Sequence, residues 1–149
     1  MPAVRGCNLP DHLLYDVENH IWFIEMGDGR VKMGMTTVAT AMAGELVAVT
    51  PKKVGRKVKP GKSCATVESG KWVGPAKSAA GGEVVEINEA LVETPSLANQ
   101  DPYENGGWMV ILQPDEWDAV KPTLTPGAEV AAPYEAKMEA DGFAGCETA

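Results

Sequence analysis

The sequence predicts a mainly β protein, and three observations support this class. Strand-like runs such as 20–24 and 30–35 are short and separated by Gly- or Pro-rich turns. Segment 44–49 (Gly-Glu-Leu-Val-Ala-Val) recurs 38 positions later as 82–87 (Gly-Glu-Val-Val-Glu-Ile). Helical patterns are few and brief. Two repeat units are too few for a solenoid, so we expect a small barrel or sandwich with pseudo-two-fold symmetry.

Length and charge narrow the functional class. The chain of 149 residues is long enough for one domain. Thirteen Lys and Arg against twenty-one Asp and Glu give a formal charge of −8. Nucleic acid is an unsuitable partner for such a chain, because phosphate binding needs a basic face. No apolar run approaches the roughly 20 residues of a membrane span, and the start lacks an apolar signal core. We therefore expect a cytoplasmic protein with no membrane anchor.

The first third of the chain should form a hairpin followed by a helix. Residues 1–12 are expected to be a loose lead-in, and 13–15 and 20–24 are expected strands. Gly27-Asp28-Gly29 is a strong turn signal before the alternating return strand 30–35. Thr36 is a suitable N-cap for a helix over 37–43, which Gly44 would end.

The middle of the chain consists of short strands around an exposed loop. Residues 54–62 alternate charged with small and turn-forming residues, which is typical of a solvated loop. Residues 64–67 form an expected strand that leads into a polar turn. A further buried strand is expected over 106–112.

The last third should be helical. Pro114-Asp115-Glu116-Trp117 places Pro early and acids in the first turn, as at a helix start. A Pro-rich connector, 121–126, then precedes a last helix near 132–140, with Pro133 in its first turn.

The segment most informative about function is the turn after strand 64–67. Lys71 falls at the tip of the hairpin predicted there, so its amine should project into solvent. This geometry suits a lysine that another enzyme acylates and that then moves between partners. An isolated lysine at a turn is ordinarily just a solvated charge.

The stretch from about Leu14 to Trp117 resembles the H-protein-like lipoyl carriers of the glycine cleavage family. The matching pieces are His20-x-Trp22, Gly34-Met35-Thr36, Gly44-Glu45-Leu46-Val47, Val67-Glu68-Ser69-x-Lys71, Gly82-Glu83-Val84-Val85-Glu86-Ile87-Asn88-Glu89-Ala90-Leu91, Asn99-x-Asp101-Pro102-Tyr103 and Gly107-Trp108.

The resemblance implies a fold, a cofactor and a site. The fold would be a barrel-sandwich hybrid, a flattened β-barrel of two antiparallel sheets with short peripheral helices and a C-terminal helix. Residues 1–149 would form a single lipoyl-carrier domain, with a core over about 13–120 and a C-terminal helical extension over about 121–142. Lys71 would carry lipoate in amide linkage, and the chain would be a non-catalytic swinging-arm carrier. The residues implied in lipoylation recognition and in the hairpin are Glu68, Ser69, Gly70, Trp72, Gly82 and Glu83.

Two departures from the family pattern affect the expected cargo. Family members that hold an aminomethyl group typically carry one acid between the His and Trp of the first strand and another four residues after the lysine. This chain has Ile21 and Pro75 there, and neither side chain balances a charge. With the altered surroundings of Lys71, this pattern resembles the lipoate-binding proteins of bacterial sulfur oxidation, whose arm carries sulfur intermediates and electrons.

The resemblance also implies partners. A lipoate ligase or a lipoyl/octanoyl transferase would load Lys71, and dihydrolipoamide dehydrogenase would act on the loaded arm. A heterodisulfide-reductase-like complex would use it in sulfur oxidation, whereas glycine cleavage enzymes would use it in the alternative function. We expect a monomer, since a carrier needs an accessible arm.

Three further alternatives remain open. A biotinyl carrier shares the fold, but its lysine usually lies between two methionines, whereas Lys71 lies between Gly70 and Trp72. An enzyme using Cys64 with His20 would need the two side chains in contact and near solvent. A purely structural module would tolerate Lys71→Arg.

The remaining reactive residues are expected to be structural. Cys64 is expected to be a buried small hydrophobe rather than a resolving thiol for the arm. Cys7 and Cys146 lie near opposite ends and could approach each other, but we do not expect a disulfide in a cytoplasmic protein. No metal site is expected. Trp72 is expected to pack or dock on a partner, with contact to the dithiolane sulfurs as the alternative.

Overall fold

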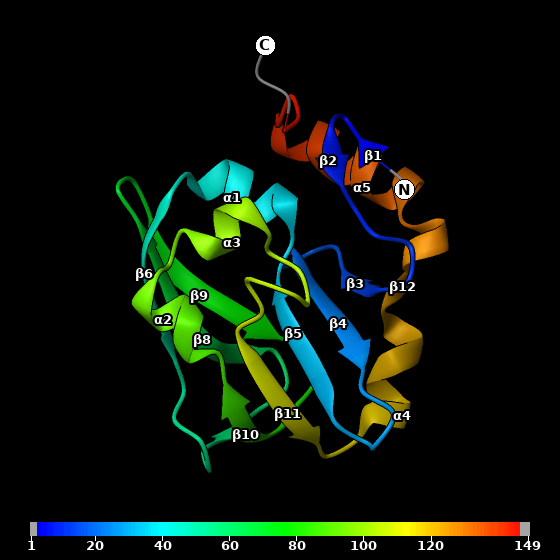
Figure 1. The fold of residues 1–149 in the computed structure, drawn as a ribbon. Coiled ribbons are helices and arrows are strands. Elements are labelled where there is room, and N and C mark those ends of the chain that lie inside the picture. The colour runs from blue at the N-terminus through cyan, green and yellow to red at the C-terminus, as the bar shows by residue number, and fades with distance from the viewer. Residues whose placement is uncertain (1–2, 147–149) are drawn as a thin grey trace.

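A computed structural model describes residues 3–146, which form two main antiparallel sheets with short helices around them (Figure 1). The larger sheet contains, in spatial order, β12 (Thr125–Pro126), β3 (Leu14–Asp16), β4 (Ile21–Glu25), β5 (Val31–Met35), β11 (Val110–Pro114), β10 (Gly82–Ile87) and β7 (Lys57–Val58). The smaller sheet contains β6 (Leu46–Pro51), β8 (Lys62–Ser69) and β9 (Val73–Ser78). A third, two-stranded sheet pairs β1 (Ala3–Val4) with β2 (Cys7–Asn8).

The helices lie at the edges of this β-structure. They are α1 (Thr37–Ala43), α2 (Glu89–Glu93), α3 (Leu97–Gln100), α4 (Trp117–Val120), the 3₁₀ turns η1 (Lys121–Thr123) and η2 (Gly127–Glu129), and α5 (Ala131–Asp141). None of the helices within residues 3–146 has the length and apolar character needed to cross a membrane.

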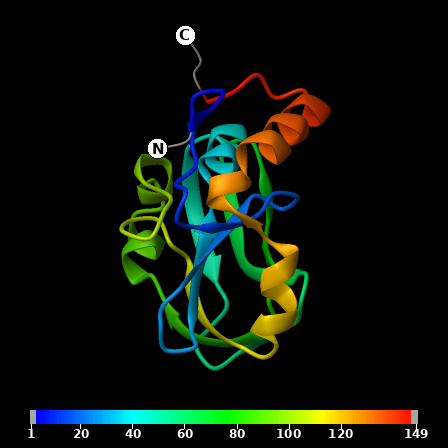
Figure 2. The ribbon, with the colours of Figure 1, turned by 90° about the vertical axis from the view of Figure 1, so that its right-hand side faces the viewer.

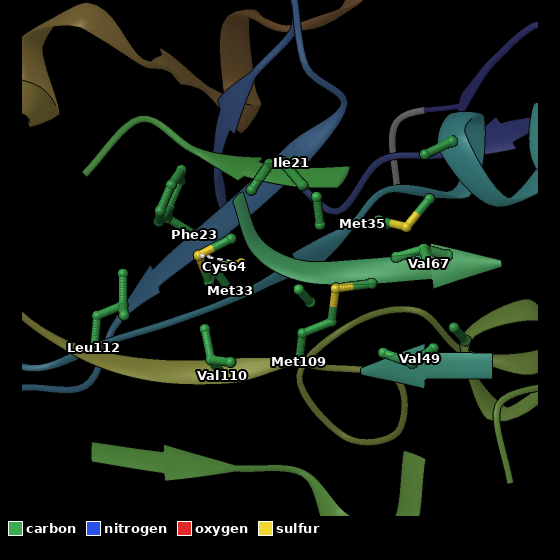
Figure 3. Close-up of a cluster of buried hydrophobic side chains, with 14 of the residues drawn as sticks. Ile21, Phe23, Met33, Met35, Val49, Cys64, Val67, Met109, Val110 and Leu112 are labelled. Carbon is green, nitrogen blue, oxygen red and sulfur yellow. Dashed lines mark hydrogen bonds between the residues drawn. The ribbon is translucent and has the colours of Figure 1, made fainter. Parts of the chain in front are cut away.

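The main hydrophobic core lies between the two large sheets (Figure 3). It combines Phe23 from β4, Met33 from β5, Val67 from β8 and Leu112 from β11, all of them buried. A second cluster, which includes Tyr15, Trp22, Leu9, Tyr134 and Met138, fills the space between the larger sheet and α5. These two sheets with their peripheral helices and C-terminal helix confirm the predicted fold class.

The internal repeat has a structural counterpart. β6 pairs with β8, and β10 pairs with β11, and each pairing contains one register shift. The shift leaves Val47 as the extra residue on β6 and Val85 as the extra residue on β10. These two valines occupy the same position in the repeat, so both strands bend at the same point.

Helix α1 forms where its local signals place it. The Thr36 side chain accepts a hydrogen bond from the amide of Ala39, and Gly44 ends the helix at φ 85°. The positive φ is the conformation in which glycine avoids the Cβ penalty of other residues. Both expected caps are confirmed.

Several other expected boundaries are corrected by tertiary contacts. The predicted loop 54–62 contains β7, because Val58 is buried against β10. The strand expected over 106–112 begins only at Val110, since the Gly107 amide turns to donate to the carbonyl of Asp101. Helix α4 begins at Trp117, after the acids expected in its first turn. The last helix matches its prediction to within one residue at each end.

The two ends of the chain are joined, contrary to expectation. Residues 3–8 form a hairpin rather than a loose lead-in, and Cys7 makes a disulfide with Cys146, with their Cα atoms 4.9 Å apart. Arg5 lies at the centre of the junction: it pairs with Glu135 and Glu139 of α5, and its carbonyl accepts from the Cys146 amide at 3.0 Å. Figures 1 and 2 both show β1, β2 and α5 together at one end of the molecule. The disulfide therefore forms because the fold brings distant segments together.

Candidate functional site: a lysine at a hairpin tip

Lys71 occupies the tip of the hairpin formed by β8 and β9. The turn covers Ser69, Gly70, Lys71 and Trp72, and the Ser69 amide closes it by donating to the Trp72 carbonyl at 2.8 Å. The Lys71 amide donates to the Ser69 hydroxyl at 3.3 Å, which fixes the backbone under the lysine. The side chain is exposed, and no ion pair among residues 3–146 includes it. The hairpin therefore holds a lysine backbone rigidly while leaving its amine available.

The lysine stem lies over the C-terminal end of α1. A Cβ added to Gly44 would stand 3.3 Å from Lys71 Cε and 3.9 Å from Nζ. Any larger residue than glycine would crowd the stem there, besides being strained by the positive φ. Gly44 thus serves both the helix end and the close approach of Lys71.

A hollow of about 390 Å³ opens beside the lysine, and we call it the Lys71 pocket. Its lining comes from β4, β5, α1 and the hairpin, and consists of Asn19, His20, Ile21, Met35, Ala39, Met42, Ala43, Lys71, Trp72, Pro75 and Ala76. Most of these side chains are apolar, and Lys71 is the only lysine or arginine among them. No carboxylate lines the pocket. It suits an uncharged, largely aliphatic group.

Trp72 forms part of the pocket wall and remains 40% exposed. A Cβ on Gly74 would collide with the Trp72 indole, so the ring lies back over the hairpin at that glycine. Val73, at 62% exposed, adds to this apolar surface. Packing on the hairpin and contact with an occupant of the pocket are therefore compatible roles for Trp72.

His20 lies at the other side of the pocket in an unusual conformation. Its φ is 57°, and its Nδ1 lies 3.0 Å from the Tyr134 hydroxyl while the two rings stack. Burial, and secondarily the charge of Lys137, lower the pKa of His20 below its ordinary value. Helix α5 is thereby connected to the pocket through Tyr134.

We expect stability to fall as the pH drops, partly through His20. The imidazole of the unfolded chain titrates near pH 6.5, whereas the imidazole of the folded protein has a lowered pKa and stays neutral to a lower pH. The contribution of neutral His20 to the free energy of unfolding is therefore fully present above pH 6.5. It is lost as the pH falls from 6.5 through the lowered pKa of the folded protein. Urea unfolding of wild type and His20→Asn at pH 7.5 and 5.0 measures this, since Asn tolerates positive φ but does not titrate. A parallel loss of stability in both proteins would contradict the role of His20.

The structure separates the other predicted site residues into two groups. Glu68, Ser69 and Gly70 lie with Lys71 and Trp72 on the hairpin, and Glu68 is exposed on β8 opposite Val73. Gly82 and Glu83 begin β10 in the other sheet, beyond the end of β9 that is distant from the tip.

Gly82 is required by close packing rather than by nearness to the lysine. A Cβ there would run into the backbone of Gln113 and stand 2.8 Å from the Cα of Pro114. Glu83 is exposed beside it, between β11 and β7. Gly82 therefore allows β10 to pack closely on β11, whereas the exposed Glu83 side chain makes no such contact.

The Cys64 and His20 enzyme alternative fails on geometry. Cys64 is fully buried in the main core, where burial raises the pKa of its thiol to about 12. Its Sγ lies 3.8 Å from the Met33 sulfur, the contact drawn in Figure 3. A buried thiol of this kind is not a nucleophile at neutral pH. Residues 3–146 also contain no cluster of three or more His, Cys, Asp and Glu suited to a metal ion.

Part of the pocket lining carries no signal in the sequence. Ala39 and Met42 come from α1, Ala76 from β9 and Asn19 from the turn before β4, and no motif contains them. The one usable signal was Gly44, because a glycine after a helix also marks a place of close approach.

These features define a class: a small β-domain that presents an exposed, unpaired lysine at the tip of a rigid hairpin beside an apolar pocket, as a carrier of a covalently attached group would. A family model described as "Glycine cleavage H-protein" matches residues 13–137. The chain belongs to the glycine cleavage H-protein family. Members of this family are non-catalytic carriers that bind lipoate on a lysine.

Individual relatives agree with this assignment. The chain is 49% identical over 135 residues to "Glycine cleavage system H protein 5" of Aquifex aeolicus, covering 88% of this chain and 90% of the relative. It is 39% identical over 133 residues to "Probable glycine cleavage system H protein 2" of Sulfurisphaera tokodaii, covering 88% and 89%. The crystal structure of an H protein from Mycobacterium marinum superposes with a TM-score of 0.72 at 32% identity, covering 87% of this chain and 98% of that one.

Proposed function

We propose that Lys71 carries lipoate in amide linkage and that the loaded protein serves the enzymes of a glycine cleavage system. The single observation that carries the attachment is the exposed, unpaired Lys71 amine at a rigid hairpin tip beside an apolar pocket. The names of the relatives support glycine cleavage as the process, in preference to the sulfur oxidation expected from sequence.

The residues around Lys71 fit a lipoyl group. Acylation removes the lysine charge, and the pocket beside it offers apolar walls from Ala39, Met42 and Trp72. Its volume of about 390 Å³ is within the range of small-ligand sites. When bound, lipoate supplies a dithiolane that opens to two thiols and closes again as a disulfide.

The protein's own contribution is positional. The hydrogen bond from the Ser69 amide to the Trp72 carbonyl holds the hairpin tip, while Gly44 allows the Lys71 stem to lie against α1. The loading enzyme needs access to the amine, which the exposed tip provides. Partner enzymes then supply the catalysis.

A second candidate function is the transport of sulfur intermediates to a heterodisulfide-reductase-like complex. One observation favours it: the Lys71 pocket presents Ile21 and Pro75 and no carboxylate. An aminomethyl ammonium placed there would lose hydration without gaining a counter-charge, which is costly. Neutral sulfur species would meet no such penalty.

Reconstitution distinguishes the two functions. Lipoylated protein is titrated into glycine decarboxylase and aminomethyltransferase, and the proposal predicts glycine-dependent aminomethyl transfer. Absence of transfer, together with binding to a heterodisulfide-reductase-like complex, would overturn glycine cleavage and support the second function.

Pro75→Asp adds a carboxylate at an exposed position of the pocket and is expected to increase retention of the cationic aminomethyl group. Pro75→Asn, of similar size but uncharged, is the matched control.

A further inference from the structure

A second groove borders α1, separate from the Lys71 pocket, and we call it the disulfide groove. It has a volume of about 460 Å³. Its lining comes from α1, α3 and the C-terminal segment, and includes Thr40, Gly44, Asn99, Gln100, Phe143 and Cys146. One groove therefore extends from the end of α1 that Lys71 contacts to the Cys7–Cys146 disulfide.

The two sulfurs of this disulfide differ in accessibility. Cys7 is completely buried, whereas Cys146 is partly exposed and lines the groove. Cys146 Sγ also lies 3.7 Å from the carbonyl oxygen of Thr37, the first residue of α1. A sulfur nucleophile that enters the groove would therefore meet Cys146 and not Cys7.

The separation between lysine and disulfide matches the reach of a lipoyl arm. Lys71 Nζ lies against Gly44 at one end of α1, and Cys146 contacts Thr37 at the other. Seven helical residues advance about 10 Å at 1.5 Å each. A lipoyl chain built from bonds of ~1.5 Å extends about 9 Å from Nζ to its sulfurs. Rotation of the exposed Lys71 side chain supplies the rest.

We propose that Cys7–Cys146 is a second redox pair, which accepts electrons from the dihydrolipoyl group on Lys71. This inference rests on the proposed function, because it requires lipoate at that lysine. Cys146 Sγ is attacked by one dihydrolipoyl thiolate, its bond to Cys7 breaks, and Cys7 leaves with the electron pair and takes up a proton. The second dihydrolipoyl thiol then displaces Cys146 as a thiol and closes the dithiolane. Two electrons and two protons pass to the cysteines, so the exchange balances without another reactant.

The protein can undergo this change without losing the junction of its ends. The Arg5 guanidinium holds Glu135 and Glu139 at 3.0 and 2.8 Å, and it donates to the Phe143 carbonyl at 2.9 Å. None of these contacts uses the disulfide. The reduced Cys146 thiol also has the Thr37 carbonyl in place as an acceptor. We infer that the pair opens and closes reversibly in the folded protein.

The test measures how many equivalents of NADH the intact lipoylated protein consumes. The starting sample has lipoate on Lys71, verified by peptide mass spectrometry, and both disulfides oxidised. Dihydrolipoamide dehydrogenase with NADH then reduces the arm. Wild type should consume two equivalents of NADH per chain, and alkylation of the folded protein should label Cys146, the accessible cysteine of the pair. A variant with both Cys7→Ser and Cys146→Ser should consume one, and Lys71→Arg should consume none.

The results distinguish failure of the redox pair from failure of the carrier function. One equivalent in both wild type and double variant, with Cys146 unlabelled, overturns the redox pair but leaves the carrier function standing. Lipoate found on another lysine, or no NADH consumption by any protein, overturns both. Consumption by Lys71→Arg would show direct reduction of the disulfide and likewise contradict the inference. The buried Cys64 should stay unlabelled and reports that the fold is intact.

Two variants that each lack one cysteine of the disulfide provide an independent readout. Cys7→Ser leaves the accessible Cys146 thiol, which should form a disulfide with the lipoyl arm that peptide mapping detects between residues 71 and 146. Cys146→Ser leaves only the buried Cys7 and Cys64 and should form none. Equal cross-linking in both variants, or none in either while circular dichroism shows native folds, would contradict the assignment of Cys146 as the attacked sulfur.

Discussion

Replacing Lys71 with arginine is expected to abolish lipoylation while leaving the fold unchanged. Arginine keeps the positive charge, but its guanidinium stays protonated and is not a nucleophile toward an activated acyl group. The fold should not respond, because the Lys71 side chain is exposed and takes part in no ion pair among the described residues. Incubation with lipoate ligase followed by intact-mass measurement should show complete modification of wild type and none of the variant.

Lys77→Arg is the matched control for this experiment. Lys77 lies on β9 of the same hairpin and is also exposed, but it is away from the tip. The control should be lipoylated as fully as wild type. Modification of Lys71→Arg at another lysine would remove the basis of the carrier site, and loss of modification in Lys77→Arg would point to general damage to the hairpin.

The largest loss of stability is expected from Trp22→Ala. Trp22 is completely buried, and its indole NH donates to the carbonyls of Met35 at 3.0 Å and Pro102 at 2.9 Å. Its ring also fills the space above Gly34, where an added Cβ would stand 3.0 Å from it. Truncation leaves a cavity and two carbonyls without their donor, at a cost of about 3–5 kcal/mol in the free energy of unfolding.

Trp72→Ala is the comparison for Trp22, since the same side chain is removed from a position where it is 40% exposed rather than completely buried. Its cost should be about 1 kcal/mol or less. Urea denaturation followed by far-ultraviolet circular dichroism measures both variants without depending on the tryptophan signal. Equal losses for the two substitutions would show that burial is not what makes Trp22 stabilising.

Local signals carried much of the fold prediction. Thr36 and Gly44 bound α1 in the structure because a side-chain cap and a positive-φ glycine act within a few residues. The hairpin around Lys71 was also predictable, since its turn depends on neighbouring residues. The short β7 was missed because Val58 becomes strand only through its pairing with Gly82, which is distant in the sequence.

The cysteines show more clearly that local patterns predict burial but not contacts between distant segments. Cys64 was expected to be a buried hydrophobe, and its place in the core confirms this. Cys7 and Cys146 are able to approach each other, but no disulfide is expected of a cytoplasmic protein, and the structure corrects this expectation. The two residues lie 139 positions apart, and local patterns do not report contacts over that separation. Only the packing of the N-terminal hairpin on α5, through Arg5, places them together.

The sequence by itself determined the β-rich class, the capped helix α1 and a lysine at the apex of a hairpin, because each depends on interactions among near neighbours. The tertiary structure decided which surfaces surround that lysine. The apolar Lys71 pocket combines β4, β5, α1 and β9, and the disulfide groove combines α1, α3 and the C-terminal segment. Contacts between such distant segments depend on the packing of the whole chain, so no local pattern encodes them.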